Sequence, residues 1–253
     1  MDIAKQLPTV ISFCSGYGGI ERGLDLAGVE HRVIAYVEIE AFAIANLVAK
    51  MESGALVPAP IFTDIKTFPA HLFRDCVDII TGGYPCQPFS AAGKRRGEDD
   101  PRHLWPYIRE HIRAIRPVQC FFENVEGHIT LGLSSVISDL EEGGYRATWG
   151  IFSASESGAP HRRKRVFIVA NAHSAYKQRS RVSSRVHKKN TNPDSRSTHR
   201  SRASAQHWDS EPRVGRVANG CPDRVDRLKL LGNGVVPQTA AKAWTALLNR
   251  SRL

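Results

Sequence analysis

Long hydrophobic runs are absent from this sequence of 253 residues. No stretch approaches the roughly 18 consecutive apolar residues that a membrane-spanning helix needs, so the sequence predicts no contact with a membrane. The first residues, MDIAKQLPTVISF, also lack the basic segment and the apolar segment that together mark a secretory leader. These absences predict a protein of the cytoplasm.

Cysteine is scarce, and its spacing fits no known framework. The cysteines are odd in number, and no two of them form a CxxC pair. Their positions are Cys14, Cys76, Cys86, Cys120 and Cys221. This pattern argues against a zinc ribbon and against a set of disulfides, so we expect reduced thiols and no bound metal.

Acidic residues are outnumbered, with 25 Asp and Glu against 35 Lys and Arg, and the net charge is +10. Residues 172–229 alone carry fourteen Lys and Arg and five Asp and Glu. A surface that binds a polyanion and a solvated basic linker explain this excess equally well. The segment also holds few large apolar residues, which predicts a loop-rich stretch that is partly disordered unless it is bound.

Short β-rich segments alternate with segments of helical periodicity over the first two thirds of the chain. This alternation predicts βαβ units and therefore an α/β fold, a doubly wound and mostly parallel sheet. The expected strands are 9–13, 31–39, 60–64, 76–83, 119–125, 146–154 and 164–171. The expected helices are 19–28, 41–51, 102–117, 133–145 and a last one from about residue 238.

A glycine-rich turn, FCSGYGGIERG, follows the first expected strand. Gly16, Gly18 and Gly19 let a ligand approach the backbone closely, and Glu38 ends the second strand, where a carboxylate accepts hydrogen bonds from ribose hydroxyls. The spacing GxGGxxxG differs from the dinucleotide pattern GxGxxG, so a nucleoside cofactor without a pyrophosphate fits better. Glycine-rich turns that bind nothing are also common.

A second unusual stretch, GGYPCQPFSAAG, follows the strand expected at 76–83. Pro85 and Pro88 stiffen the loop on both sides of Cys86, because proline fixes φ. Stiff loops at the carboxyl ends of parallel strands are where open α/β sheets place their functional residues. Cys86 is therefore a candidate nucleophile, and a packing cysteine in a turn is the alternative.

Charged side chains in two later segments complete the candidate site. Glu123 and Asn124 end the strand expected at 119–125, on the same edge as Cys86 if the sheet is parallel. A thiolate can then attack while the carboxylic acid protonates the acceptor. Arg163 and Arg165 alternate before a strand and can face an anion together. Surface salt bridges and solvated charges are the plainer interpretations.

Taken in order, these segments resemble the cytosine-5 DNA methyltransferase family, of the prokaryotic or phage type. The resemblance covers residues 10–171 and the chain from about Leu231 onward. It is carried by SGYGG, Glu38, the Asp64 of FTDI, GGYPCQPFS, ENV, GAPH with RKR, and GNGVVP. Three positions depart from the family, since Ser12, Cys14 and His161 stand where an aspartate, a phenylalanine and a glutamine are usual.

The resemblance implies a Rossmann-like fold that binds S-adenosyl-L-methionine, and it assigns residues to three roles. The implied catalytic residues are Pro85, Cys86, Glu123, Asn124, Arg163 and Arg165. The implied cofactor residues are Cys14, Gly16, Tyr17, Gly18, Gly19, Glu38, Ile39, Asp64, Ile65, Gly83, Leu104, Asn233, Gly234 and Val235. The implied DNA contacts are Gln87, Ser90, Arg179, Arg181 and Arg185.

The resemblance also implies a mechanism and a domain layout. The Cys86 thiolate adds to C6 of a cytosine flipped out of double-stranded DNA, Glu123 hydrogen-bonds or protonates N3, and Arg165 supports the thiolate or the O2 region. Residues 1–171 would form the catalytic and cofactor-binding domain, 172–229 a short target-recognition segment, and 230–253 the C-terminal motif and a helix returning to the catalytic domain. We expect a monomer.

Three other functions stay open at this point. A tRNA cytosine-5 methyltransferase has the same core, and the basic segment suits either nucleic acid. A non-catalytic nucleic-acid-binding protein of the same fold has no chemical reason to keep Cys86, Glu123 and Arg165 together. An oxidoreductase that uses a flavin or nicotinamide explains neither the glycine spacing nor the cysteine.

Overall fold

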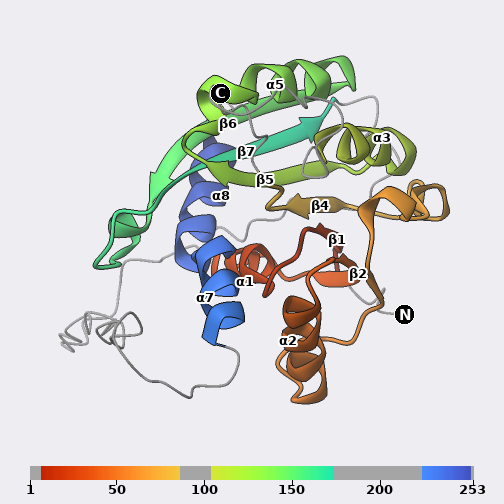
Figure 1. Cartoon of the computed structure of the whole chain (residues 1–253). Coiled ribbons are helices and arrows are strands. Elements are labelled where there is room, and N and C mark those ends of the chain that lie inside the picture. Colours follow the sequence, from red (N-terminus) through yellow and green to blue (C-terminus); the bar gives the residue numbers. More distant parts are fainter. Residues whose placement is uncertain (1–6, 86–103, 174–223, 252–253) are drawn as a thin grey trace, which may run out of the picture.

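The computed structural model describes residues 7–85, 104–173 and 224–251. Within them the chain forms a seven-stranded sheet in the order β3-β2-β1-β4-β5-β7-β6 (Figure 1). Five neighbouring strands run parallel, whereas β7 runs antiparallel to both β5 and β6. The strands are β1 Thr9–Phe13, β2 Arg32–Val37, β3 Ile61–Phe62, β4 Ile79–Gly82, β5 Gln119–Val125, β6 Tyr145–Ser153 and β7 Lys164–Ala172. The expected doubly wound, mostly parallel sheet is confirmed.

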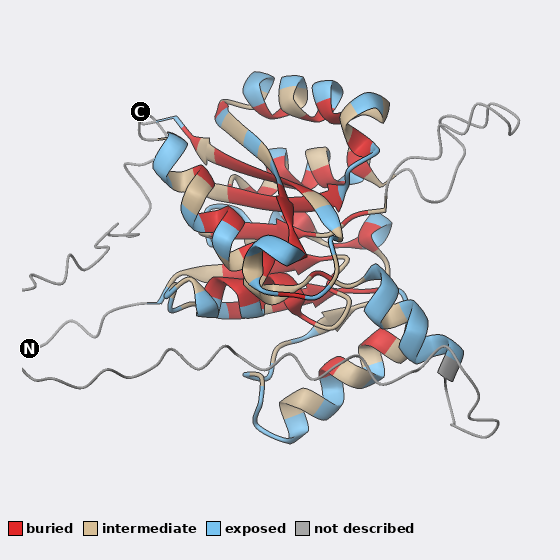
Figure 2. Cartoon of the chain, turned by 90° about the vertical axis from the view of Figure 1, so that its left-hand side faces the viewer, coloured by how far each residue is buried: buried red, intermediate tan, exposed pale blue. Residues whose placement is uncertain are grey.

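Helices cover both faces of this sheet. The α-helices are α1 Gly19–Leu26, α2 Ala41–Glu52, α3 Trp105–Ile115, α4 His128–Leu131, α5 Leu133–Glu142, α7 Arg224–Asn233 and α8 Pro237–Ser251. Short 3-10 helices lie at Ile65–Thr67, Ala70–Phe73 and Ala154–Ser157. The strands are buried between the helical layers, and the helices expose their outer faces (Figure 2).

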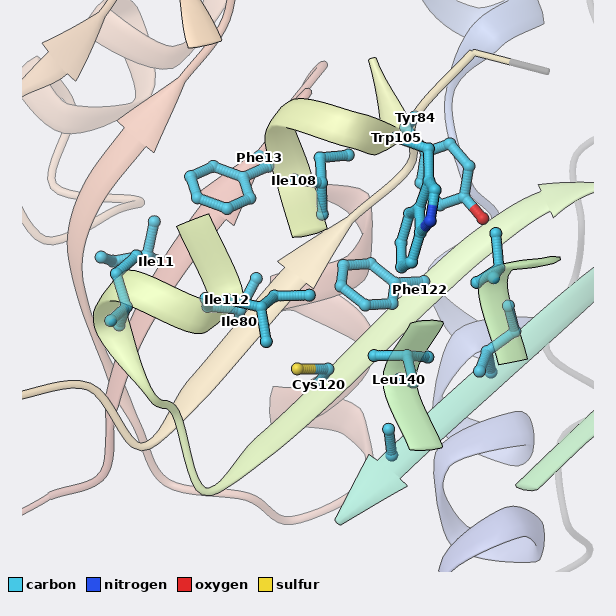
Figure 3. Close-up of a cluster of buried hydrophobic side chains, with 14 of the residues drawn as sticks. Ile11, Phe13, Ile80, Tyr84, Trp105, Ile108, Ile112, Cys120, Phe122 and Leu140 are labelled. Carbon is cyan, nitrogen blue, oxygen red and sulfur yellow. The ribbon is translucent and has the colours of Figure 1, made fainter. Parts of the chain in front are cut away.

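The layer formed by α3 and α5 packs on one face through aliphatic and aromatic side chains. Ile108, Ile112 and Ile115 recur at helical spacing on α3, and each is at most 4% exposed. They meet Ile80 and Phe122 from the strands, as Figure 3 shows. The amphipathic pattern of this helix therefore decides which side faces the sheet.

The opposite layer consists of α1, α2 and α8. Leu24 of α1 and Leu247 of α8 are fully buried there, and the ring of Trp244 meets that of Phe121 edge-on at 5.1 Å. The helix α8 thus packs the last part of the described chain against the sheet, as the apolar spacing beyond residue 238 predicted.

Several elements are shorter than expected, for local reasons. The strand expected at 76–83 begins only at Ile79, because the chain turns at Asp75, whose φ is 57°. The helix expected to reach residue 117 ends at Ile115, since Arg116 adopts a left-handed conformation before Pro117. The helix expected at 133–145 ends at Glu142, before two glycines. The strand expected at 60–64 is only the two residues of β3.

One helix of the C-terminal part was not predicted. The helix α7 runs across the boundary expected between residues 229 and 230. Its exposed face carries Val225, Leu228 and Leu231, so it shows little of the one-sided pattern that reveals a packed helix. Several predicted residues lie outside the described ones, namely Cys86, Gln87, Ser90, Arg179, Arg181 and Arg185.

Candidate active site

The candidate site lies at the carboxyl ends of β1, β2, β4 and β5. The chain runs from β1 outward to β2 and β3 and then returns to β4 beside β1, so the strand order reverses between β1 and β4. Ligands of open α/β sheets bind at such a reversal, because the loops leave it in opposite directions. The glycine-rich turn, Glu38 and Gly83 follow strand ends at this edge, and Glu123 lies two residues before the end of β5.

The glycine-rich turn needs its glycines for two different reasons. Gly16 and Gly18 have φ of 54° and 80°, in the left-handed region that other residues rarely adopt. Gly19 has ordinary backbone angles, but a Cβ there would lie 2.6 Å from the carbonyl oxygen of Val235. The first two glycines therefore allow the turn, and the third lets the C-terminal part of the chain pack against it.

Glu38 fastens the end of β2 to this turn. Its Oε2 accepts a hydrogen bond of 2.7 Å from the amide of Gly16, and its Oε1 accepts one of 2.9 Å from the amide of Glu40. The residue is only 7% exposed. Each carboxylate oxygen can accept more than one bond, so Glu38 can hold the turn and still accept from a ligand.

Cys14 begins the same turn in a left-handed conformation, with φ of 51°. Burial, together with the nearby charge of Glu38, raises the pKa of its thiol to about 12. The thiol is therefore neutral and unreactive at neutral pH. The expected cofactor residue is thus a neutral, half-buried side chain rather than a second nucleophile.

Gly83 leaves a gap between three side chains from distant parts of the sequence. A Cβ at Gly83 would lie 3.4 Å from Glu123 Oε2, 3.8 Å from a methyl of Val235 and 3.9 Å from a methyl of Ile20. The structure therefore brings together the expected catalytic acid and two expected cofactor residues. In the sequence, Gly83 stands three residues before Cys86.

Glu123 ends up buried and next to two arginines. It is 5% exposed, and Arg165 Nε lies 2.8 Å from its Oε1 as an ion pair without the alignment of a hydrogen bond. Burial raises the pKa of Glu123 to about 7, and the positive charges of Arg165 and Arg163 oppose this rise. A carboxyl with such a pKa can donate or accept a proton at neutral pH.

Asn124 holds the backbone that leads into the Cys86 loop. Its Nδ2 donates a hydrogen bond of 3.1 Å to the carbonyl oxygen of Tyr84, and its Oδ1 accepts one of 2.8 Å from the amide of Val125. The Tyr84 hydroxyl and His128 Nε2 lie 3.0 Å apart in the core. The Tyr84 ring also packs against Trp105, which Figure 3 shows beside it. The base of the loop is therefore rigidly packed.

Arg163 lies on the same side of Glu123 but makes other contacts. Its Nη2 donates hydrogen bonds to the carbonyl oxygens of Gly232 and Gly234, at 2.7 and 2.6 Å. The hydroxyl of Tyr17 donates to the neighbouring carbonyl oxygen of Val235. Arg163 and Tyr17 thus both hold the end of α7 and the residues after it. We call residues 232–234 the GNG turn.

The remaining expected cofactor residues lie apart from these contacts. Asp64 accepts a hydrogen bond of 2.8 Å from the amide of Lys66 and so caps a 3-10 helix. Ile65 is buried, with its carbonyl oxygen 2.6 Å from His111 Nε2. Ile39 is 71% exposed, and Leu104 and Asn233 lie at the start of α3 and at the end of α7. Their role in a cofactor site stays a prediction.

Two side chains of this site were missed by sequence reasoning. Lys50 of α2 donates a hydrogen bond of 2.6 Å to the carbonyl oxygen of Tyr17, in the middle of the glycine-rich turn. His128, fully buried beside the hydroxyl of Tyr84, was also not singled out. Lys50 ends an ordinary amphipathic helix, and His128 follows a glycine, so neither stands in a recognisable pattern. Only the packing of distant segments reveals their contacts.

Comparison with known proteins decides the family. A sequence profile described as C-5 cytosine-specific DNA methylase matches residues 8–217. The chain belongs to this family. Type II methyltransferase M.NaeI of Lentzea aerocolonigenes is 33% identical over 165 residues, which cover 64% of this chain and 39% of that protein. M.NgoMIV of Neisseria gonorrhoeae is 31% identical over 64% of this chain and 51% of its own length.

A solved structure agrees on the fold of this chain. The Dnmt2 methyltransferase of S. pombe superposes with a TM-score of 0.54 at 26% identity, over 65% of this chain and 51% of that one. The chain thus spans about half the length, or less, of the relatives named here. Among its described residues, no cluster of side chains could hold a metal ion, and none of the described helices could cross a membrane.

Proposed function

We propose that this chain is a DNA (cytosine-5-)-methyltransferase that transfers a methyl group from S-adenosyl-L-methionine to C5 of a flipped cytosine. One observation carries the proposal. The buried carboxyl of Glu123, with a pKa of about 7, lies beside Gly83, three residues before Cys86. A nucleophile at Cys86 would therefore be only three residues along the chain from the position that contacts this protonatable acid, at the edge where the glycine-rich turn also lies.

The residues of this chain would prepare the cytosine for methylation. The thiolate of Cys86 adds to C6, and the proton of Glu123 passes to N3, so the added electron pair makes C5 nucleophilic. Arg165, 2.8 Å from Glu123, then stabilises the carboxylate that forms. After methylation, C5 would lose its proton to a base and the C6–S bond would break, which releases the Cys86 thiolate. The N3 proton would return to Glu123, so both residues would be regenerated.

The residues present also fit the cofactor. S-adenosyl-L-methionine would supply an electrophilic methyl group. Glu38 would accept hydrogen bonds from its ribose, and the open backbone at Gly16, where nothing lies within 4 Å of an added Cβ, would admit it closely. Gly83 and Val235 leave the gap in front of Glu123. Double-stranded DNA would be the partner, the protein would act as a monomer, and its place would be the cytoplasm.

The test measures transfer of tritiated methyl groups to duplex DNA and to tRNA, both from a host without cytosine methylation. We expect label in DNA, lost in Cys86→Ala but kept in Cys76→Ala, a matched change at an exposed cysteine outside the site. Bisulfite sequencing of the product gives the target sequence. Label in tRNA alone assigns the other substrate, and equal labelling by Cys86→Ala would refute the proposed mechanism.

A further inference from the structure

Arg163 and Arg165 come from one short motif, but the structure gives them different partners. Arg165 pairs with the carboxylate of Glu123. Arg163 donates two hydrogen bonds to backbone carbonyl oxygens of the GNG turn. It has no hydrogen bond to Glu123 among the described contacts. Its Nε is buried and lacks a hydrogen-bond partner within the described residues. The two arginines therefore do different work.

The backbone of Arg163 is itself held by hydrogen bonds to the residue that follows β6. The amide of Ala154 donates hydrogen bonds to the carbonyl oxygens of Arg162 and Arg163, at 3.0 and 3.4 Å. Arg163 also has φ of 22°, a conformation that a residue with a side chain adopts only when its surroundings enforce it. The guanidinium thus projects from a fixed point at the start of β7.

The turn that Arg163 holds is packed too tightly at Gly234 to tolerate a side chain there. A Cβ at Gly234 would lie 2.0 Å from the ring of Tyr17, so this ring rests directly on the turn. Val235 follows, with its carbonyl oxygen bound by Tyr17 and its side chain beside Gly83. Whatever holds the turn therefore also sets where Val235 stands relative to Glu123 and the glycine-rich turn.

The helices on both sides of the turn have attachments of their own. The helix α8 is fixed by its buried side chains, Ala240, Trp244 and Leu247 among them. The helix α7 adds an ion pair of 2.7 Å between Lys229 and Glu40, and both partners are half exposed. Exposed pairs of this kind contribute little. Loss of the Arg163 contacts should therefore loosen the turn and leave α8 in place.

We propose that Arg163 is a positioning residue of the cofactor site, which acts with Tyr17 to clamp the Gly232–Gly234 turn and so fixes Val235 beside Gly83. The proposal rests on the proposed function for the identity of the cofactor. On this proposal Arg163 does not contact the cytosine, and Arg165 is the arginine that pairs with the catalytic acid, Glu123.

The experiment compares the full-length chain with Arg163→Met, Arg163→Lys and the control Arg162→Met, an exposed neighbour. Calorimetry with S-adenosylhomocysteine, without DNA, measures the dissociation constant. We expect Arg163→Met to weaken binding about 10-fold to 100-fold, as when charge-assisted hydrogen bonds are lost. Arg163→Lys should restore part of this affinity, and Arg162→Met should match the wild type.

Amide hydrogen exchange supplies a readout that does not need the cofactor. In Arg163→Met, the amide of Gly234, which donates to Leu230, should exchange at least about tenfold faster, and the amides of 243–247 should be unchanged. Tyr17→Phe should also speed exchange at Gly234. The double variant should lose less protection at Gly234 than the sum of the losses in the two single variants, because both side chains hold one turn.

The outcomes separate this proposal from the proposed function. If wild type does not bind S-adenosylhomocysteine, the cofactor assignment fails, and exchange at Gly234 still decides whether Arg163 holds the turn. Unchanged affinity and unchanged exchange in Arg163→Met would overturn the clamp. The clamp would also be overturned if Arg163→Met bound the cofactor normally and were impaired only in a step that requires DNA. Arg163 would then contact the DNA substrate rather than position the cofactor site.

Discussion

At the scale of single residues, two buried carboxylates at one edge of the sheet have different surroundings. Glu38 accepts two backbone hydrogen bonds, from the amides of Gly16 and Glu40. Glu123 faces a glycine and an arginine, and burial raises its pKa to about 7. Backbone donors suit a fixed binding group, whereas the poorly solvated carboxyl suits proton transfer. We therefore propose binding for Glu38 and acid chemistry for Glu123.

The raised pKa of Glu123 predicts a pH-dependent stability. Between the ordinary value of 4.5 and about 7, the folded protein keeps a proton that the unfolded chain has lost. Stability should therefore fall as pH rises through this window, by on the order of 3 kcal/mol. Glu123→Gln cannot ionise and should lack this component. Urea unfolding at a series of pH values measures it, with the exposed Glu126→Gln as control. Parallel curves for wild type and Glu123→Gln would contradict the prediction.

Asn124 offers a second test at this scale. Asn124→Ala removes the donor to Tyr84 and the acceptor for the Val125 amide, in a side chain that is 3% exposed. We expect a loss of about 1–3 kcal/mol, because two backbone groups lose hydrogen bonds to a buried side chain. Urea unfolding measures it, and Asn249→Ala, on the exposed side of α8, is the control. A loss no larger than that of the control would show that Asn124 does not hold this backbone.

At the scale of elements, the contact between α1 and α8 depends on the absence of a side chain. A Cβ at Gly23 would lie 2.6 Å from the Cβ of Ala240 and 3.0 Å from the carbonyl oxygen of Pro237. The two helices therefore meet almost backbone to backbone. This approach also brings the start of α8 close to the glycine-rich turn, which precedes α1.

Gly23→Ala should have two opposite effects on stability, a gain from helix propensity and a loss from packing. Alanine in a helix is favoured over glycine by up to about 1 kcal/mol. The clash involves backbone and a helix-borne Cβ, neither of which can rotate away, and overpacking of this kind typically destabilises by about 1–3 kcal/mol. We expect net destabilisation in thermal unfolding. Arg22→Ala, exposed on the same helix, should be close to neutral. A stabilised Gly23→Ala protein would mean that the helices separate easily.

At the scale of the whole molecule, charge is unevenly distributed along the chain. The basic segment 172–229 carries nearly all of the net charge of +10, and most of it lies outside the described residues. The segment begins at the last residue of β7, beside the amino end of β5 and so at the edge opposite the candidate site, and it ends within α7. The helix α7 leads into Gly234, whose carbonyl oxygen binds Arg163, so the segment is tethered close to the candidate site at its α7 end.

This tethering predicts DNA binding that depends strongly on salt. Each phosphate contact contributes about 0.9 to the slope of log affinity against log salt concentration. Replacing Arg179, Arg181 and Arg185 with alanine should lower the slope and weaken target and non-target DNA alike, since phosphate contacts carry no sequence information. Fluorescence anisotropy at several salt concentrations measures this.

The control for that experiment replaces Arg22, Arg74 and Arg113 with alanine. These arginines are exposed and lie outside the basic segment, so the control has the same net charge as the first triple variant. It should keep the wild-type slope. Loss of discrimination between sequences at constant overall affinity would instead mean that Arg179, Arg181 and Arg185 read bases. We also expect a short recognition sequence, of roughly two to four base pairs, because a polar segment supplies phosphate contacts more easily than base contacts.

Much of the fold and the location of the site followed from sequence patterns. Alternating strand and helix periodicities predicted the parallel sheet, because periodicity reflects which side chains are buried. Glycine and charged residues at strand ends predicted one common edge, because parallel strands end together. The order of the motifs pointed to the family, which the profile match then showed. All of these inferences depend on information that is local in the chain.

Only the tertiary structure decided which of these residues touch. Arg163 and Arg165 look alike in the sequence, yet one binds the carbonyl oxygens of Gly232 and Gly234 and the other binds Glu123. The raised pKa of Glu123 also depends on burial beneath segments distant in the chain. The physical reason is that hydrogen bonds and desolvation depend on distances in space, and a linear pattern does not contain the distance between residues 163 and 234.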